Sequence, residues 1–402
     1  MKKGWETKRL GEVCLIKPAK SEVREKLEDS DFVSFLPMEA LGVDQMLATP
    51  IQVKRLSEVA GSYTYFAEGD VLLAKITPCF ENGKLGIASG LKNGVGFGSS
   101  EYIVFRPNST VRKEWLYYLL SRDSFRNEGA ERMSGAVGHK RVSKEFIEAY
   151  PIPIPPLAEQ QRIVGILDEA FAGIARAKAN AEQNLQNARA LFESHLQAVF
   201  SQRGEGWVET TVGAEIRFID YRGKTPVKTE IGIRLITAKN VKMGYLQESP
   251  MEYIAADNYE SWMTRGIPKK GDVLFTTEAP LANVAQLDTD EKVAFAQRII
   301  IMQPNAEKLD CTFLKYLLLS QPVQERIRSK GTGATVQGIK ASLLKTIEIS
   351  FPISLQEQRR IVAQLDALAL ETRSLAAIYE RKLAALEELK KSLLHQAFSG
   401  EL

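Results

Sequence analysis

Two long segments of the chain place apolar residues at alternating steps of three and four, which is the spacing of coiled-coil helices. The first segment begins at Leu157 and reaches Phe200, and the one step missing from its stripe falls on Lys178. The second begins at Leu355 and keeps the same spacing as far as Leu393. Forty-odd residues make about 60–65 Å of helix, so either helix alone would leave a long apolar stripe in water.

The two helices belong to an internal repeat. "LAEQQRIVGILD" (157–168) and "LQEQRRIVAQLD" (355–366) align in register at an offset of 198. Upstream, "GWETKRLGEV" is echoed by "GWVETTVGAEI", "EGDVLLA" by "KGDVLFT" and "WLYYLLS" by "FLKYLLL". The repeating unit is therefore one globular domain followed by one long helix. The predicted division is a globular domain at 1–155, a helix at 156–202, a second domain at 203–353 and a second helix at 354–402.

Each apolar stripe needs a partner, and the other helix is the most direct one. The first helix leads to the second domain and the second helix returns from it, so the predicted pair is antiparallel. This arrangement relates the two domains by a pseudo-twofold axis. The alternative is that each helix packs on its own domain or on a second chain.

The globular parts have the pattern of an α/β fold. Apolar runs such as "EYIVFRP" (101–107) and "RIIIMQP" (298–304) indicate buried strands, and residues 113–129 have helical periodicity that ends at a glycine. The predicted fold class is α/β, with two similar globular domains separated by two long antiparallel helices.

Composition restricts the possible classes of protein. The 402 residues are 44% apolar and 26% charged, as in globular proteins. The first residues lack the apolar run of a signal peptide and no apolar stretch is long enough to cross a membrane, so we expect a cytoplasmic protein. The three cysteines, Cys14, Cys79 and Cys311, stand far apart, which favours reduced structural thiols over a metal site.

The net charge is only +3, so charge alone does not indicate a nucleic-acid-binding protein. Residues 1–156 hold 22 Lys and Arg against 20 Asp and Glu, and residues 201–354 hold 20 against 18. Basic residues are nevertheless concentrated locally, with six against one acid between Arg222 and Lys242. "GHKR" (138–141) is a second basic cluster.

Two related but different domains at a fixed separation suit a reader of two sites on one linear polymer, and duplex DNA fits best. Twofold proteins read two half-sites whose spacing the protein sets. Here the domains differ in sequence, so the half-sites should differ too. A spacer of about 60 Å corresponds to fewer than about 20 base pairs.

The full set of motifs resembles the specificity subunits of type I restriction-modification systems. "PPLAEQQRIVGILD" after a Pro-rich strand, its repeat "ISLQEQRRIVAQLD" and the ending "HQAFSGEL" are similar to the two conserved regions of that family. "AKITPCFENGKLG" (74–86), "DYRGKTP" (220–226) and "ITAKNV" (236–241) resemble blocks of its target-recognition domains. The resemblance covers the whole chain.

This resemblance implies a non-catalytic subunit that reads a bipartite, asymmetric DNA target with a non-specific gap. Its partners would be double-stranded DNA, two methyltransferase subunits that modify adenine N6, and two restriction subunits with motor and nuclease activity. The chain itself would hold no cofactor, while S-adenosylmethionine, ATP and Mg would be bound by the partner subunits.

The residues agree with a non-catalytic role. The chain lacks the Asn/Asp-Pro-Pro-aromatic motif that an adenine methylase needs. "RGKTP" (222–226) ends like a P-loop, but Phe218 stands where the first glycine is required. His195 and His395 lie in the predicted helices, where a packing or surface role is expected rather than a metal site.

Candidate DNA contacts follow from chemistry and from the block resemblance. Lys and Arg contact phosphates, whereas Arg, Asn and Gln read base edges. The candidates are Lys75, Thr77, Asn82, Lys84, His139, Lys140 and Arg141 in the first domain, and Arg222, Lys224, Lys239, Asn240, Thr335, Gln337 and Lys340 in the second.

The repeated helix starts supply candidate docking residues for the methyltransferase subunits. We expect one exposed polar surface presented twice: Glu159, Gln160 and Arg162, repeated as Glu357, Gln358 and Arg360. Helix-start chemistry is an equal alternative, because acidic residues favour the positive end of a helix. A different class of function also stays open, a scaffold that holds two protein-binding domains apart without nucleic acid.

Overall fold

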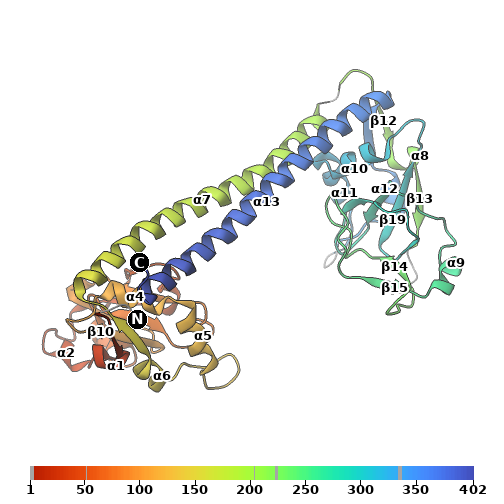
Figure 1. Cartoon of the computed structure of the whole chain (residues 1–402). Coiled ribbons are helices and arrows are strands. Elements are labelled where there is room, and N and C mark those ends of the chain that lie inside the picture. The colour runs from red at the N-terminus through yellow and green to blue at the C-terminus, as the bar shows by residue number, and fades with distance from the viewer. Residues whose placement is uncertain (1–3, 51, 203, 222–224, 334–336) are drawn as a thin grey trace. The chain divides into compact units, whose positions relative to one another are not determined.

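The computed structural model describes residues 4–50, 52–202, 204–221, 225–333 and 337–402. It divides into two compact units, Met1–Glu182 with Arg381–Leu402, and Gln183–Glu380. Each unit holds one globular domain and a part of each of two helices, α7 (Leu157–Ser201) and α13 (Leu355–Ser399), which are continuous over 45 residues each (Figure 1).

The first domain (residues 4–156) contains a five-stranded sheet in the order β2-β10-β7-β8-β4, a four-stranded sheet in the order β5-β3-β9-β6, and the pair β1-β11. Its strands are β1 (Glu6–Arg9), β2 (Cys14–Ile16), β3 (Phe32–Leu36), β4 (Leu47–Ala48), β5 (Gln52–Arg55), β6 (Thr64–Ala67), β7 (Val71–Ala74), β8 (Leu85–Ala88), β9 (Val95–Gly98), β10 (Tyr102–Pro107) and β11 (Pro151–Ile154). Its helices are α1 (Leu10–Val13), α2 (Ser21–Arg24), η1 (Met38–Ala40), α3 (Leu56–Val59), η2 (Lys92–Gly94), α4 (Lys113–Leu120), α5 (Asp123–Glu131) and α6 (Lys144–Ala149).

The second domain (residues 204–354) contains the sheets β13-β19-β16-β17 and β15-β14-β18 and the pair β12-β20. Its strands are β12 (Trp207–Thr211), β13 (Ile216–Asp220), β14 (Ile233–Ile236), β15 (Glu252–Ile254), β16 (Val273–Thr276), β17 (Val284–Gln286), β18 (Val293–Phe295), β19 (Ile299–Pro304) and β20 (Glu348–Pro352). Its helices are α8 (Val212–Glu215), η3 (Ala256–Asn258), α9 (Tyr259–Trp262), α10 (Cys311–Leu319), α11 (Gln321–Ser329) and α12 (Ala341–Lys345).

Strand pairing confirms the internal repeat and the α/β class. The antiparallel pairs β10–β7 and β1–β11 of the first domain have counterparts in β19–β16 and β12–β20. A parallel pair also recurs, as β3–β9 and as β14–β18. The apolar runs expected to be strands form β10 and β19, and β7 and β16 beside them are buried at every position.

One expected helix is two. The segment 113–129 breaks at Arg122, whose ψ of 140° is extended, and α4 and α5 lie on either side of the break. The turn lets Leu119 and Phe125 enter the same core. Gly129 does not end the helix; it lies inside α5, where a β-carbon would come within 2.4 Å of the Phe80 ring.

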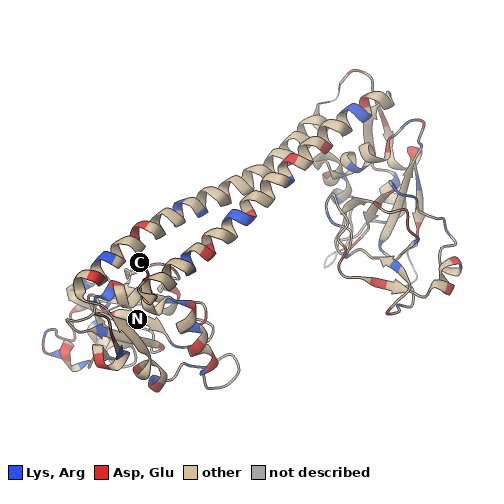
Figure 2. Cartoon of the chain, in the orientation of Figure 1, with Lys and Arg blue, Asp and Glu red and all other residues tan. Residues whose placement is uncertain are grey.

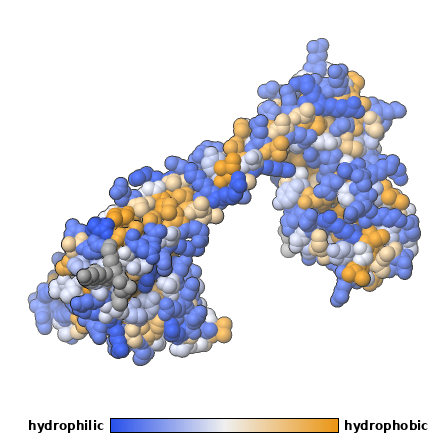
Figure 3. All heavy atoms as spheres, in the orientation of Figure 1, coloured by the Kyte–Doolittle hydropathy of each residue, from blue (hydrophilic) through white to orange (hydrophobic). Residues whose placement is uncertain are grey.

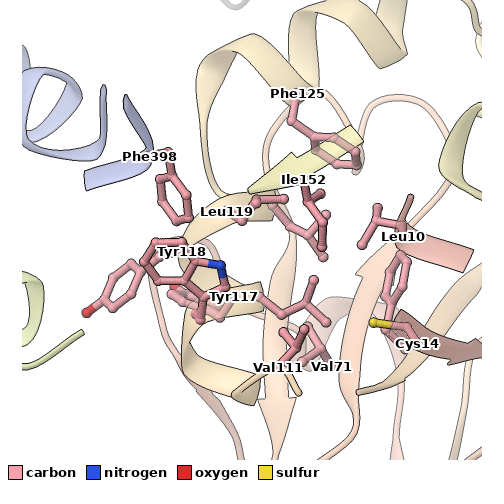
Figure 4. Packing of buried hydrophobic residues seen from close by; sticks show 14 of the residues in the cluster. Leu10, Cys14, Val71, Val111, Tyr117, Tyr118, Leu119, Phe125, Ile152 and Phe398 are labelled. Carbon is pink, nitrogen blue, oxygen red and sulfur yellow. The ribbon is translucent and has the colours of Figure 1, made fainter. Parts of the chain in front are cut away.

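Both long helices contribute to the domain cores. In the first unit, Val164 and Leu167 of α7 share a core with Leu394 and Phe398 of α13. The Phe398 ring lies 4.4 Å, centroid to centroid, from Trp115, and Figure 4 shows it beside the α4 residues Tyr118 and Leu119. The alternative that the helices pack on the globular domains is therefore also realised in part.

The two helices run antiparallel in each unit. In the first unit the beginning of α7 packs with the end of α13, and in the second Leu196 and Phe200 near the end of α7 pack with Ile361 and Leu365 near the start of α13. Lys178, the break in the heptad stripe, forms a 2.6 Å ion pair with Glu387 of α13. Within the described ranges, no helix is long and apolar enough to cross a membrane.

Candidate nucleic-acid interface

In the first domain, a turn and a hairpin bring several candidate DNA contacts together. The turn that follows β7 starts at Lys75, and the hairpin at residues 134–142 returns beside it. The Thr77 amide donates to the Lys140 carbonyl at 2.9 Å, and the Val142 amide donates to the Lys75 carbonyl at 3.0 Å. Lys75, Thr77, Lys140 and Arg141 are thereby held on adjacent strands of backbone.

The hairpin projects its tip into solvent. His139, Lys140 and Arg141 are all exposed, and Val137 at the tip is 94% exposed. Gly135 and Gly138 have φ of 126° and 81°, a conformation that glycine adopts far more readily than other residues. A projecting backbone with basic side chains has a shape that can enter a DNA groove.

Arg141 is held in place by Glu101. Its guanidinium donates to both carboxylate oxygens, at 2.8 and 2.9 Å. The hydrogen bond with Arg141 lowers the pKa of Glu101, so the carboxylate stays ionised. Lys75 lies 3.9 Å from the same carboxylate and donates to the Ser100 carbonyl at 2.9 Å.

The remaining candidates on the turn have internal partners. The Thr77 hydroxyl donates to Glu81 at 2.9 Å, and the half-buried Lys84 donates to the Met38 carbonyl at 2.7 Å. Asn82 is exposed. In this arrangement Lys84 supports the loop around Met38, and Asn82 is free to face a ligand.

The second domain has an equivalent turn and hairpin that carry different side chains. The Ile339 amide donates to the Thr277 carbonyl at 2.9 Å, and Glu278 pairs with Gly338, as Ile76 pairs with Arg141 in the first domain. Arg298 forms a 2.9 Å ion pair with Glu278. Gln337 and Lys340 are exposed here, whereas the candidates Arg222, Lys224 and Thr335 lie outside the described residues.

The expectation that Asn240 contacts DNA is wrong. Asn240 is 1% exposed, and its amide oxygen accepts from the Thr237 backbone and hydroxyl. Its amide nitrogen lies at hydrogen-bond distance from the carbonyls of Gln247, Glu248 and Pro250. The side chain holds the loop after β14 together, while its neighbour Lys239 is exposed.

The expectation that Gln160 and Gln358 belong to an exposed docking surface is also wrong, because both are completely buried. Gln160 accepts from the Arg112 amide at 2.9 Å and donates to the carbonyls of Thr110 and Pro155. Gln358 repeats this pattern with the Asp310 amide and the carbonyls of Lys308 and Pro352. Each glutamine joins the start of a long helix to the loop before α4 or α10.

The other helix-start candidates remain on the surface. Arg162 bonds to Glu159 at 2.7 and 2.9 Å, and Arg360 bonds to Glu357 at 2.8 and 2.7 Å. Arg162 also donates to the Leu402 carbonyl at 2.8 Å. These two exposed ion pairs occupy equivalent positions in the two repeats. The docking hypothesis requires this equivalence, because it expects the same surface once in each repeat.

A second contact that recurs in both repeats was not predicted from the sequence. The Tyr118 hydroxyl donates to Asp168 at 2.5 Å, and the Tyr316 hydroxyl donates to Asp366 at 2.5 Å. All four residues stand at the repeat offset of 198, in "WLYYLL"/"FLKYLL" and at the ends of the two helix motifs. Identity at matched polar positions was the available signal, but only the fold shows that these positions touch.

Basic and acidic residues are interspersed on both domains and along both helices (Figure 2). The visible face of the first domain is largely hydrophilic, and apolar residues gather along the helices (Figure 3). In the described part of the chain, no group of three or more His, Cys, Asp or Glu residues is placed to hold a metal ion.

Comparison with known proteins shows which family has this architecture. A family model described as "Type I restriction modification DNA specificity domain" matches residues 2–186 and 242–386. The chain belongs to this family. One match falls in each repeat of this specificity protein; together they include most of α7 and α13, whereas residues 187–241 lie between them.

Several curated relatives bear the same designation. The EcoEI and EcoAI specificity subunits of Escherichia coli are 43% and 41% identical over 163 and 162 residues, which is 40% of this chain. These matches span 27% of the length of either relative. The putative MjaX specificity subunit of Methanocaldococcus jannaschii is 23% identical over 83% of this chain and 78% of its own.

Solved structures show the same fold. A chain from a study of complex assembly and conformational transition in a type I restriction-modification system aligns with a TM-score of 0.80, at 22% identity over 100% of this chain and 99% of its own. The HsdS subunit of Thermoanaerobacter tengcongensis aligns with a TM-score of 0.66, at 20% identity over 100% and 98%.

Proposed function

We propose that this specificity protein is the non-catalytic, DNA-reading subunit of a type I restriction-modification complex. It reads a bipartite, asymmetric DNA target with a non-specific gap. The observation that carries the proposal is the repeated turn and hairpin, which has the same backbone pairing in both domains but different side chains. The first domain presents His139, Lys140 and Arg141, and the second presents Gln337 and Lys340 beside the Glu278–Arg298 pair.

Unlike side chains on a shared frame imply unlike half-sites. A lysine, such as Lys140, donates to guanine, whereas a glutamine, such as Gln337 at the matched position, reads adenine. The two long helices set the separation of the half-sites, and the repeated pairs Glu159–Arg162 and Glu357–Arg360 dock two adenine-N6 methyltransferase subunits. Two restriction subunits join through that complex, which acts in the cytoplasm.

Cofactors belong to the partners in this proposal. S-adenosylmethionine, ATP and Mg are bound by the methyltransferase and restriction subunits, and this chain holds none. The alternative of a scaffold without nucleic acid is not favoured, because the family that matches both repeats is a DNA specificity family.

The test is co-expression with the methyltransferase subunit of the same system, followed by genome-wide mapping of N6-methyladenine. One bipartite motif with two unlike halves is expected. Replacing residues 4–156 with the first domain of another specificity protein, with both helices retained, should change one half of the motif and leave the gap unchanged. Methylation without a bipartite motif, or a change in both halves, would contradict the proposal.

A further inference from the structure

A cavity of about 350 Å³ opens in the first domain beside the turn and the hairpin. Four lysines line it: Lys17 after β2, Lys20 before α2, Lys75 after β7 and Lys144 at the start of α6. We call it the lysine cleft. Among the described residues that line it there is no Asp or Glu, and Ile103 is one of its apolar lining residues.

Two acidic residues, Glu148 and Glu101, lie close to cleft lysines, but neither lines the cleft. Lys144 is paired at 3.1 Å with Glu148, and Lys75 lies 3.9 Å from Glu101. Lys20 is bound to two carbonyl oxygens, those of Ala60 and Gly61, at 3.0 and 2.8 Å. An ammonium has three donors, so each of these lysines keeps at least one for a ligand.

Lys17 is presented by an unusual backbone. Its φ is 58°, a conformation that residues other than glycine rarely adopt, and its amide is fixed by a 2.8 Å bond to the Val104 carbonyl. Such strained positions cluster at functional sites. In the described part of the chain, the exposed Lys17 ammonium has no hydrogen-bond or ion-pair partner.

The lysines also act on one another. Partial burial and the nearby Lys17 charge lower the pKa of Lys20. Partial burial lowers the pKa of Lys75, and Lys17 and Arg141 add to this effect while Glu101 opposes it. An anion placed among these charges would relieve their repulsion.

Three of the four cleft lysines have uncharged counterparts in the second domain. Strand pairing places Ile219, Thr277 and Ala341 of the second domain where the first has Lys17, Lys75 and Lys144. Both Ile219 and Thr277 are buried, at 1% and 3% exposure. At these three positions the charge is therefore present in the first domain and not in the second.

We propose that the lysine cleft binds backbone phosphates of the DNA strand that the neighbouring hairpin contacts. The inference rests on the proposed DNA-reading function and adds to it a contribution to DNA binding that does not depend on the base sequence. The cleft and the hairpin are continuous, because Lys75 lines the cleft and its carbonyl binds the Val142 amide of the hairpin. Lysines contact phosphates as point charges and carry no base specificity.

The test compares the salt dependence of DNA binding by the full chain. Lys17→Gln and Lys144→Gln remove charges that no described backbone carbonyl depends on, and Lys26→Gln, on the exposed surface after α2, is the matched control. Fluorescence anisotropy with a labelled duplex carrying the mapped target, and with a scrambled duplex, is followed from about 50 to about 200 mM salt. Unchanged thermal unfolding establishes that each variant is folded.

Each cleft substitution should make the slope of log K against log salt shallower by about 0.9, which is about an eightfold loss of affinity at 0.1 M salt. The loss should be equal on both duplexes, and the control should follow the wild type. Parallel slopes for folded cleft variants and wild type would overturn the proposal. A free nucleotide offers the same phosphate chemistry, so AMP binding is titrated as well; AMP binding that Lys17→Gln abolishes, with an unchanged DNA slope, would also overturn it.

Failure of the cleft and failure of the proposed function give different results. If the methylation map shows a bipartite motif but the slopes do not change, only the cleft assignment falls. If the methylation map shows no bipartite motif, the proposed DNA-reading function is contradicted, and so is the proposal for the lysine cleft, which depends on it.

Discussion

The Tyr118 hydroxyl donates a 2.5 Å hydrogen bond to the Asp168 carboxylate, and Tyr316 makes the same bond with Asp366. Each bond joins the globular domain to the long helix that follows it, eleven residues into α7 or α13. Burial raises the pKa of both phenols, and the bonded carboxylate adds to the shift, so each hydroxyl remains a donor.

Replacing either tyrosine with phenylalanine should lower the free energy of unfolding by about 1 kcal/mol, because one hydrogen bond to a solvent-exposed carboxylate is lost. Urea denaturation measures the change. Since the folded pKa lies above the unfolded value, this stability is present below pH about 10 and is lost as pH rises beyond it. The phenylalanine variants should lack that alkaline loss, and Tyr245→Phe, at an exposed site, should behave as wild type.

Gln160→Ala should lower the free energy of unfolding by about 2–4 kcal/mol, because it leaves the part-buried Arg112 amide and two carbonyls without their partner and opens a cavity. The adjacent Gln161→Ala, on the exposed side of α7, is the control and should change stability little. A stable Gln160→Ala protein that fails to bind its methyltransferase would instead restore the docking role.

Reversing the charge of Arg162 and Arg360 together should weaken methyltransferase binding while thermal unfolding changes little. Both side chains are about half exposed, and ion pairs on a solvent-exposed helix surface contribute little to stability. Pull-down and size-exclusion chromatography of the mixed subunits measure the effect. Either single reversal should release one methyltransferase copy and retain the other; full assembly of the double variant would count against the docking surface.

Asn240→Ala should destabilise the second domain by about 2–3 kcal/mol and should not redefine the DNA target, because the lost amide satisfies buried loop groups. The exposed neighbour Lys239→Ala should leave stability unchanged and weaken DNA binding. Thermal unfolding and methylation mapping separate the two effects. A new half-site in a stable Asn240→Ala protein would contradict the structural role.

Cys14 should resist alkylation in the folded protein. Burial raises the pKa of its thiol to about 12, so on the order of 0.01% is thiolate at pH 8. Burial also raises the pKa of Cys311 to about 11, with nearby Asp272 and Asp310 adding to the shift. Mass spectrometry after iodoacetamide treatment should find both residues modified only in denaturant, and labelling of native Cys14 at the rate of a free thiol would refute this.

Much of the architecture was determined by the sequence alone. The heptad stripes predict α7 and α13 because a helix can bury only the face its sequence period makes apolar. The repeat predicts two copies of one α/β domain, and the antiparallel direction follows from connectivity. The helix break at Arg122 was not predicted, because the periodicity of α4 continues in α5 and only the shared core requires the turn.

The candidate site depended far more on the tertiary structure. Composition identified Lys75, Lys140 and Arg141, and backbone pairing brings them together. It also selected Asn240, Gln160 and Gln358, which the fold buries, because a polar letter does not reveal whether its partner is water or a backbone amide. The lysine cleft joins residues from four separate segments, 17, 20, 75 and 144, and only sheet pairing makes them neighbours. Periodicity is a local property that a sequence carries, whereas a site is a set of distances between remote residues, which the packed chain alone fixes.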